Sequence, residues 1–473
     1  MNAKKRELHQ HVGDVLASRF PEVGETEPEL LAHHFTEANV VDRALGYWRK
    51  AAERATARMA HAEALGHVDK AKKLIAALPV GAERDEWELA FLVTEGPLQM
   101  TLHGWESPQA NRVYEAARVT AERLGRPDEL FPAVWGLWLG AHSSGQHARA
   151  HGLYEDMFRL LERTDDVECV LQANHAGCTQ MLAEGLPHAA LEHVEQLLNN
   201  YQFDVHRKLG LFYGAHDPGC CGLSTSVFIL MMLGHLDQAE AESQKALALS
   251  ERIDHKPTVA HTCQFRAEYE IILNRPDHAE PYLKTCMSLS DKYSLAAYHN
   301  AADLMLGYVR VRRGDVEAGV RQAEAALETL KAVPSRRFHL PIRMSIVGNA
   351  KAAAGDVEGA LAIFEAALEA TSSTGEVWYE AETLRLKSEM LLALSKPRAE
   401  EAEQCLMAAI ASAQKQDAKL WELRAATVLA GLWVRQGRHA DARDLLAPVY
   451  GWFTEGLGTA DVKDAAALLT ELT

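Results

Sequence analysis

The sequence predicts an all-α protein, a right-handed α-solenoid of helix pairs that repeat about every 40 residues. Three observations support this prediction. The chain is rich in Ala, Leu and Glu, and it has few of the β-branched runs that mark strands. One short phrase of small and packing residues recurs along the chain. The copies of this phrase are almost evenly spaced, which is the signature of a repeat architecture.

The recurring phrase begins at a turn residue, Gly or Asn, and continues with Ala five positions later and packing residues at positions nine and twelve. Gly355 begins the fullest copy, which continues to Ala360, Phe364 and Ala367. Gly or Asn can adopt the left-handed conformation that ends a helix tightly. The Ala keeps the second helix thin where it crosses the first, and the two later residues lie on the same face. Each copy therefore predicts one pair of antiparallel helices.

The turn positions form a ladder at 145, 185, 234, 274, 314, 355, 395 and 437. The steps are 40, 49, 40, 40, 41, 40 and 42 residues, a regularity that chance does not produce. The long step contains an irregular insert from about Tyr201 to Gly222. The copy at 395 is weaker, because a two-residue insertion moves its alanine to Ala402. In the copy at 314, Gly319 stands where alanine is expected.

The ladder divides the chain into two predicted regions. Residues 1–80 form an N-terminal helical segment with a first helix pair, whose turn residue is Asn39. Residues 81–473 form the main superhelix and end in capping C-terminal helices. Trp452 and Phe453 are expected to seal the last pair, because the end of a solenoid exposes an apolar face unless it is capped.

The order of small residue, Gly, Ala, aromatic residue and Ala resembles the tetratricopeptide repeat (TPR), although the period exceeds the usual value of about 34 residues. Over nearly its whole length, the chain also resembles the C-terminal repeat region of large bacterial proteins that carry a class III adenylate/guanylate cyclase domain and an AAA/STAND-type ATPase. The phrases that carry this second resemblance are PELLAHHFTEANVVDRALGYWRKAAERA (Pro28–Ala55), GAHDPGCCGLS (Gly214–Ser224) and WELRAATVLAGLWVRQGRHADARDLLAPVYGWFTEG (Trp421–Gly456).

In that bacterial group the chemistry lies N-terminal to the repeats. The present sequence begins with a segment that would follow the ATPase, and it contains neither a G-x-x-x-x-G-K-[ST] phosphate loop nor a strand with paired metal-binding aspartates. The resemblance therefore implies a stand-alone or truncated sensor and scaffold portion without the catalytic modules.

Composition excludes several other classes of protein. Lys and Arg number 49 and Asp and Glu number 66, a net charge of −17 that argues against nucleic acid or an anionic membrane as partner. Residues 1–20 lack the apolar core of a signal peptide, and the longest apolar stretch, Leu223–Leu233, is far shorter than the roughly 20 residues of a membrane span. Seven scattered cysteines do not form a disulfide framework. These features predict a cytoplasmic protein.

Side chains with metal-ligand or catalytic chemistry are densest in the insert, at His216, Asp217, Cys220 and Cys221. Adjacent cysteines do not easily face one ion, and the C-x-x-C spacing of strong zinc sites is absent. We interpret this segment as a turn in which Asp217 caps a helix and Pro218 is its first residue. An enzyme with a site near His216–Cys221 is a weaker alternative.

A second pair of metal-ligand residues, His147 and His151, stands four residues apart on one expected helix face without a third ligand nearby. A solvated helix face is the simpler interpretation of this pair. No G-x-S-x-G elbow occurs in the sequence. We therefore predict no catalytic residue, no metal and no cofactor.

The inner face of each first helix would line the concave groove of the superhelix. Counted back from the turn residues, positions thirteen, ten, six and three point inward and are rich in polar and aromatic side chains. Thr179, Ser345 and Glu389 belong to this face, and the candidate partner-binding residues are Trp135, His142, His175, His261, Gln264, Glu268, Tyr308, Asn349, Arg385 and Arg424.

Such a groove suits an extended peptide or a helix of a partner protein. The leading prediction is therefore a non-catalytic interaction scaffold or sensor that regulates signalling. The alternative is a module that senses a small ligand for an ATPase or nucleotide cyclase. Contact between the ends of two solenoids would also permit a homo-oligomer.

Overall fold

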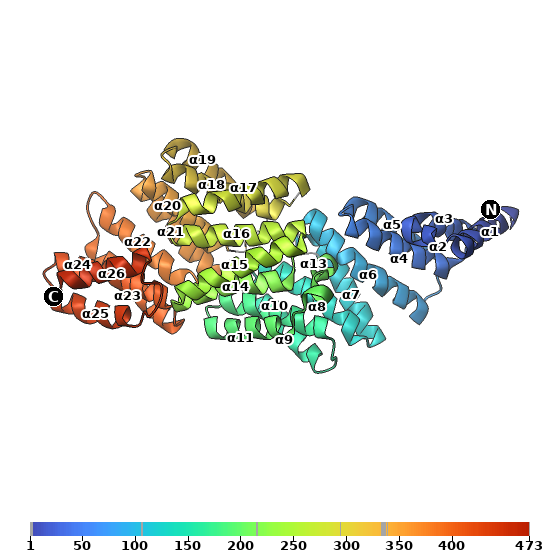
Figure 1. Cartoon of the computed structure of the whole chain (residues 1–473), viewed down its shortest axis with the longest axis horizontal. Coiled ribbons are helices and arrows are strands. Elements are labelled where there is room, and N and C mark those ends of the chain that lie inside the picture. Colours follow the sequence, from blue (N-terminus) through green and yellow to red (C-terminus); the bar gives the residue numbers. More distant parts are fainter. Residues whose placement is uncertain are drawn as a thin grey trace. The chain divides into compact units, whose positions relative to one another are not determined.

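The computed structural model describes residues 3–105, 107–213, 216–293, 295–332, 337 and 339–472, and every regular element in these ranges is a helix (Figure 1). By its internal contacts the chain divides into two units. The first contains the described residues of Met1–Gly140, Glu155–Cys169 and Lys208–Ala215. The second contains those of Ala141–Tyr154, Val170–Arg207 and His216–Thr473.

The first unit is built from helices α1 to α7 and the short helix α13. Their bounds are Ala3–Arg19, Pro21–Thr26, Pro28–Ala38, Val41–Ala57, His61–Ile75, Ala82–His103 and Pro108–Leu124, and Leu209–Tyr213 for α13. Helices α8, α9 and α10 contribute residues to both units and span Pro127–Ser143, His147–Leu161 and Val167–Ala183. The boundary predicted after residue 80 lies between α5 and α6.

The second unit contains the remaining helices. In chain order, α11, α12 and α14 to α26 span Pro187–Asn200, Phe203–His206, Pro218–Leu233, Leu236–Ile253, Lys256–Ile272, Pro276–Tyr293, Ala296–Arg312, Val316–Ala332, Leu340–Ala353, Val357–Thr374, Glu380–Ala393, Ala399–Lys415, Lys419–Arg435, His439–Gly451 and Ala460–Glu471.

The predicted turn ladder is confirmed, since its residues lie between consecutive helices that pack side by side, such as α18 and α19 (Figure 1). At seven of the eight turns φ is positive, as the left-handed termination of the first helix requires, and the exception is Ser395 in the weaker copy. The values are 73° at Gly145, 71° at Gly185, 86° at Gly234, 57° at Asn274, 93° at Gly314, 83° at Gly355 and 79° at Gly437, and 63° at the earlier Asn39.

The irregular copy at 314 has a packing reason. A Cβ at Gly319 would lie 2.6 Å from the backbone oxygen of Gly307, and a Cβ at Gly307 would lie 2.7 Å from the backbone nitrogen of Ala323. Helices α18 and α19 thus cross so closely that even alanine is too large at the fifth position. In the displaced copy at 395, Ala402 is fully buried, as the shifted alignment predicts.

The first unit buries aromatic rings against glycines. A Cβ at Gly96 or at Gly136 would lie within 2.5 Å of the ring of Tyr114, so α6 and α8 approach this side chain closely. A Cβ at Gly13 of α1 would lie 2.8 Å from the ring of Phe35 on α3. The N-terminal helix therefore covers the first helix pair.

The insert between α11 and α14 holds the two short helices α12 and α13. The predicted helix start is confirmed, because the Asp217 carboxylate accepts a hydrogen bond from Cys220 N–H at 2.9 Å and Pro218 is the first residue of α14. The Tyr201 hydroxyl donates to the same carboxylate at 2.9 Å. Helix α14 is buried along its whole length, which explains the apolar run at 223–233.

Within the second unit, the early repeats pack against repeats five steps further along the ladder. The turn residue at 145 lies against the end of the second helix of the repeat at 355. In the same way, the turn at 185 lies against the end of the repeat at 395, and the turn at 234 lies against the end of the repeat at 437. Each contact joins a turn glycine to a side chain: Gly145 to Thr374, Gly185 to Gln416, and Gly234 to Trp452.

Backbone hydrogen bonds accompany these contacts. Val377 N–H donates to Ala183 carbonyl oxygen at 2.8 Å, and Gly456 N–H donates to the Asp237 carboxylate at 3.2 Å. Because a backbone donor needs an acceptor in one direction and at one distance, these bonds fix the register between the two sets of repeats.

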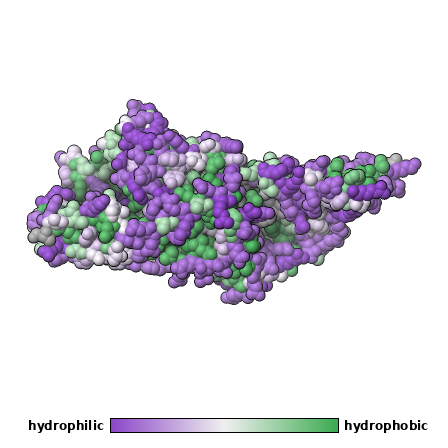
Figure 2. Space-filling view, viewed as in Figure 1, coloured by the Kyte–Doolittle hydropathy of each residue, from purple (hydrophilic) through white to green (hydrophobic). Residues whose placement is uncertain are grey.

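Hydrophilic residues cover most of the face seen in Figure 2, in line with the acidic, charged composition. In the described part of the chain, no helix combines the length and the apolar character that crossing a membrane requires.

The close approach at Gly234 can be tested by a matched pair of substitutions. A Cβ at Gly234 would lie 2.6 Å from the Trp452 ring, whereas a Cβ at Gly355 meets nothing within 4 Å, and both residues have positive φ. Gly355→Ala should lower the free energy of unfolding by about 1 kcal/mol through backbone strain alone. Gly234→Ala should lower it by about 2–4 kcal/mol, because overpacking adds to the strain. Urea denaturation measures both, and equal losses would contradict the five-repeat contact.

Candidate functional site

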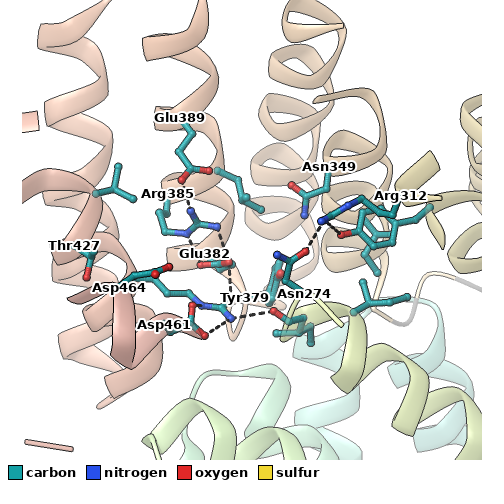
Figure 3. Close-up of a pocket in the computed structure, with 17 residues that line it drawn as sticks. Asn274, Arg312, Asn349, Tyr379, Glu382, Arg385, Glu389, Thr427, Asp461 and Asp464 are labelled. Atoms are coloured by element: carbon teal, nitrogen blue, oxygen red, sulfur yellow. Dashed lines mark hydrogen bonds and ion pairs between the residues drawn. The ribbon is translucent and has the colours of Figure 1, made fainter. Parts of the chain in front are cut away.

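A polar pocket with a volume of about 400 Å³ opens on the inner face of the second unit (Figure 3). Helices α16, α18, α20, α22, α24 and α26 supply its walls. Three arginines and four acidic side chains line it, together with two asparagines and two tyrosines: Arg312, Arg385, Arg424, Glu382, Glu389, Asp461, Asp464, Asn274, Asn349, Tyr308 and Tyr379.

Arg424 lies at the centre of the pocket's ion network. Its Nε and Nη2 donate to the two Asp461 oxygens at 2.8 and 2.9 Å, its Nη1 donates to Glu382 at 2.8 Å, and its Nη2 also donates to the Ile272 carbonyl oxygen at 2.9 Å. The side chain is only 9% exposed. Four hydrogen bonds hold this guanidinium in one orientation and join α16, α22, α24 and α26.

Arg385 extends the network along α22. Its guanidinium donates twice to Glu382, at 2.8 and 2.9 Å, and pairs with Glu389 at 2.7 Å. Burial alone would raise the pKa of Glu382, but Arg385 and Arg424 outweigh it and hold this pKa at about 2. Glu382 is therefore an ionised carboxylate shared by two arginines.

Two charges at the pocket rim have no oppositely charged partner among the described residues. Arg312 donates to the Asn274 side-chain oxygen and, at 2.8 Å, to the Tyr308 hydroxyl, but it pairs with no carboxylate there. The exposed Asp464 carboxylate makes no ion pair or hydrogen bond within the same ranges. Figure 3 shows the two side chains on opposite sides of the pocket.

Four of the ten predicted partner-binding residues meet in this pocket: Tyr308, Asn349, Arg385 and Arg424. Trp135 belongs to the first unit, where its ring lies 5.1 Å from that of Tyr213. The other five lie in the buried interior of the second unit: His142, His175, His261, Gln264 and Glu268.

Side chains of other helices pack against this set, whose members are all buried. His142 pairs with Gln180 at 3.0 Å, and Glu268 pairs with His339 at 3.0 Å. Burial lowers the pKa of His261 to about 3, so its ring is neutral. In the second unit these inward positions are buried, whereas those at the pocket line an opening of about 400 Å³.

Of the five other charged residues of the pocket, Glu389 belongs to the predicted inner face and four are missing from the predicted set. Arg312 lies two positions before a turn, outside the spacing used to project the inner face, and Asp461 and Asp464 lie on the C-terminal helix, beyond the last repeat. Glu382 does follow the spacing, at thirteen positions before 395, which is the weakest copy of the phrase. The acidic pair three residues apart on α26 is the one local signal that could have suggested the site.

The prediction that His147 and His151 lie on a solvated helix face is wrong for His147, whose side chain is buried and only 2% exposed. Its ring lies 4.0 Å from Glu376, because the loop after α21 packs over this part of α9. Burial lowers the pKa of His147 to about 4. His151 pairs with Glu184 at 2.9 Å and is partly exposed.

Cys220 and Cys221 are both buried at the start of α14. Burial raises the pKa of both thiols, so neither is an activated nucleophile in this environment. Within the described residues, His175, His216 and Cys221 form the one group whose ligand atoms all lie close enough for a metal ion, within 4.8 Å of one another.

The ion network predicts a pH-dependent contribution to stability. The pKa of Glu382 lies near 2 in the folded chain against an ordinary value of 4.5, so its stabilising effect is complete above pH 4.5 and is lost as the pH falls through 2. Glu382→Gln should lower the free energy of unfolding by about 3–5 kcal/mol at pH 7, because it leaves two buried arginines underpaired.

The difference in stability between the wild type and Glu382→Gln should shrink steadily between pH 4.5 and pH 2 in urea denaturation. Glu389→Gln on the same helix is the control, since this partly exposed acid should cost less than about 1 kcal/mol. A difference that does not change with pH would contradict the assignment of an ionised Glu382.

Comparisons with known proteins agree with the repeat fold. No protein-family model matches the chain. An uncharacterized protein of Rhizobium meliloti (strain 1021) is 23% identical over 411 residues, which are 86% of this chain but 39% of that protein. The chain thus spans about two fifths of the length of this relative.

Among solved structures, a Rap protein complexed with competence and sporulation factor is similar, with a TM-score of 0.56, 12% identity, and coverage of 79% of this chain and 98% of that one. A STAND protein with a tetratricopeptide repeat sensor from Pyrococcus horikoshii is 16% identical, with a TM-score of 0.42 over 85% of this chain and 56% of that one. By its fold, the chain is a TPR-like helical-repeat protein.

Proposed function

We propose that this chain is a non-catalytic interaction module that binds an extended peptide, or a segment of a partner protein, in the polar pocket. The observation that carries this proposal is the arrangement of its charges. A rigid network around Glu382 neutralises Arg385 and Arg424, while Arg312 and Asp464 present opposite charges at the rim. A pocket with two separated, opposite charges complements a ligand that carries both.

An extended polypeptide matches the chemistry of the walls. Asn349 lies between these charges and can both donate to and accept from a peptide backbone. The hydrogen bonds of Arg424 already fix the inner wall, so little side-chain freedom is lost when a ligand binds.

The charge balance of the lining indicates the character of the ligand. Three arginines against four acidic residues give 3 − 4 = −1. Because Arg385 and Arg424 are already paired, the ligand is expected to place a basic side chain or amino terminus at Asp464 and an acceptor, such as a carboxylate or carbonyl, at Arg312.

The alternative function is sensing of a small zwitterionic ligand. The volume of about 400 Å³ lies within the range of roughly 300–1,000 Å³ that is typical of small-molecule sites. Its polar lining favours a peptide, since small-molecule pockets are mostly apolar.

The regulatory context is part of the proposal. We infer that the partner belongs to an ATPase or nucleotide cyclase system of a bacterial cytoplasm. The three phrases that resemble cyclase–ATPase proteins support this inference. The Rhizobium meliloti relative also supports it, because the match covers only 39% of that longer protein.

Selection from a display library of random linear peptides tests the proposed site. Peptides selected on the wild-type chain should bind Arg312→Gln and Asp464→Asn at least tenfold more weakly, because each variant removes one charge-assisted contact. Fluorescence anisotropy with a labelled selected peptide measures the dissociation constants. Both positions are exposed, so the melting temperature should hardly change.

Arg310→Gln is the matched control, because Arg310 lies on the same helix but pairs with Asp315 outside the pocket. It should leave peptide affinity unchanged. Selected peptides that bind both pocket variants as tightly as the wild type would contradict the proposed site. Stabilisation by an amino acid or another small zwitterion, lost in the same variants, would instead favour the small-ligand function.

A further inference from the structure

We propose that the second unit binds one zinc ion between His175, His216 and Cys221. His175 lies on α10, His216 precedes α14 by two residues and Cys221 lies in the first turns of α14. Each side chain offers one ligand atom, and the three atoms lie within 4.8 Å of one another. This site is separate from the polar pocket and from any function proposed for it.

The burial of the three side chains supports a bound ion. His175, His216 and Cys221 are 3%, 6% and 1% exposed. Among the described residues, the Nε2 atom of His216 is buried without a hydrogen-bond partner, which is costly for a polar atom inside a protein. A metal ion bound through this nitrogen would satisfy it.

Neighbouring groups hold the two rings in place. The Gln172 side-chain oxygen lies 2.9 Å from Nδ1 of His175, and the Tyr298 hydroxyl lies 3.3 Å from Nδ1 of His216. The ring of His261 stacks on that of His216 at 3.8 Å. Metal-binding histidines usually have such a partner on the ring nitrogen that does not bind the metal, because it fixes the ring orientation.

The donor set fits zinc. Two imidazoles and a thiolate are ligands of intermediate softness that suit Zn²⁺, with bonds of about 2.0–2.3 Å. Tetrahedral geometry with such bonds sets the ligand atoms about 3.5 Å apart, so separations of up to 4.8 Å must shorten by at most about 1.3 Å. Three protein ligands leave the fourth position for a water molecule.

The protonation states follow from burial. Burial lowers the pKa of His175 to about 3, so its ring is neutral and has a lone pair for the metal. Burial raises the pKa of Cys221, so the thiol keeps its proton until the ion arrives. Binding forms a Zn–S bond and releases one proton to solvent, and the metal keeps its charge of +2 throughout.

A zinc ion at this position would join α10 to the start of α14 across the irregular insert, where the ladder has its long step. In a solenoid each repeat depends on its neighbours, so this bond would stabilise the junction at the long step of the ladder.

The test uses the full chain, stripped of metal by a chelator and then loaded with Zn²⁺ or with Co²⁺ as a spectroscopic substitute. We expect one zinc ion per chain by elemental analysis and a higher melting temperature with Zn²⁺. The Co²⁺ form should show a thiolate-to-cobalt charge-transfer band. Fewer than about 0.2 zinc ions per chain after loading would overturn the proposal.

Cys221→Ser should abolish the charge-transfer band and weaken Zn²⁺ binding at least tenfold, and His216→Gln should weaken binding similarly. Cys220→Ser is the matched control, because Cys220 is the adjacent, equally buried thiol outside the cluster, and it should keep the band and the stoichiometry. A band that survives in Cys221→Ser, or disappears in Cys220→Ser, would overturn the assignment. The stoichiometry of the wild type stands even if a variant does not fold, which circular dichroism detects.

Discussion

The structure of the second unit depends on the contact between each early repeat and the repeat five steps further along. The hydrogen bond from Val377 N–H to Ala183 carbonyl oxygen and the packing of Gly185 against Gln416 set this register. Neighbouring helix pairs alone fix only a local geometry. The five-repeat contact makes the second unit a folded body in which residues more than 190 positions apart are neighbours, as Ala183 and Val377 are.

This contact decides which part of the inner face is accessible. Within the buried part of this face, inward-pointing polar residues pair with other buried groups, as Glu268 does with His339. At the end of α16, the Arg424 side chain donates a hydrogen bond to the Ile272 carbonyl oxygen. The polar pocket lies next to this hydrogen bond. A polar residue on this face is therefore not by itself evidence that a partner reaches it.

The difference between contacts within a helix pair and contacts between distant repeats explains what the sequence could predict. Helix pairs and turns follow from local rules, such as a left-handed residue at Gly355 and a small residue at Ala360, and these predictions are confirmed. The contact between repeats five steps apart leaves no local pattern in the sequence. His147 is buried by this contact, although the sequence predicts a solvated helix face there. The pocket contains residues of both kinds. Asn349 follows the repeat spacing and was predicted, whereas Asp461 lies on a helix beyond the last repeat and was not.

The pocket and the closure of the second unit are thermodynamically linked. Arg424 joins α16, α22, α24 and α26, so the pocket has its present shape only while these helices remain in register. A ligand that contacts Arg312 on α18 and Asp464 on α26 would bind this closed arrangement and not one in which the helices have separated. By mass action such a ligand stabilises the closed coil by RT ln(1 + [L]/Kd), where [L] is the free ligand concentration and Kd its dissociation constant. A partner that contacts the late repeats elsewhere would then respond to occupancy of the pocket, because both bind the same closed arrangement.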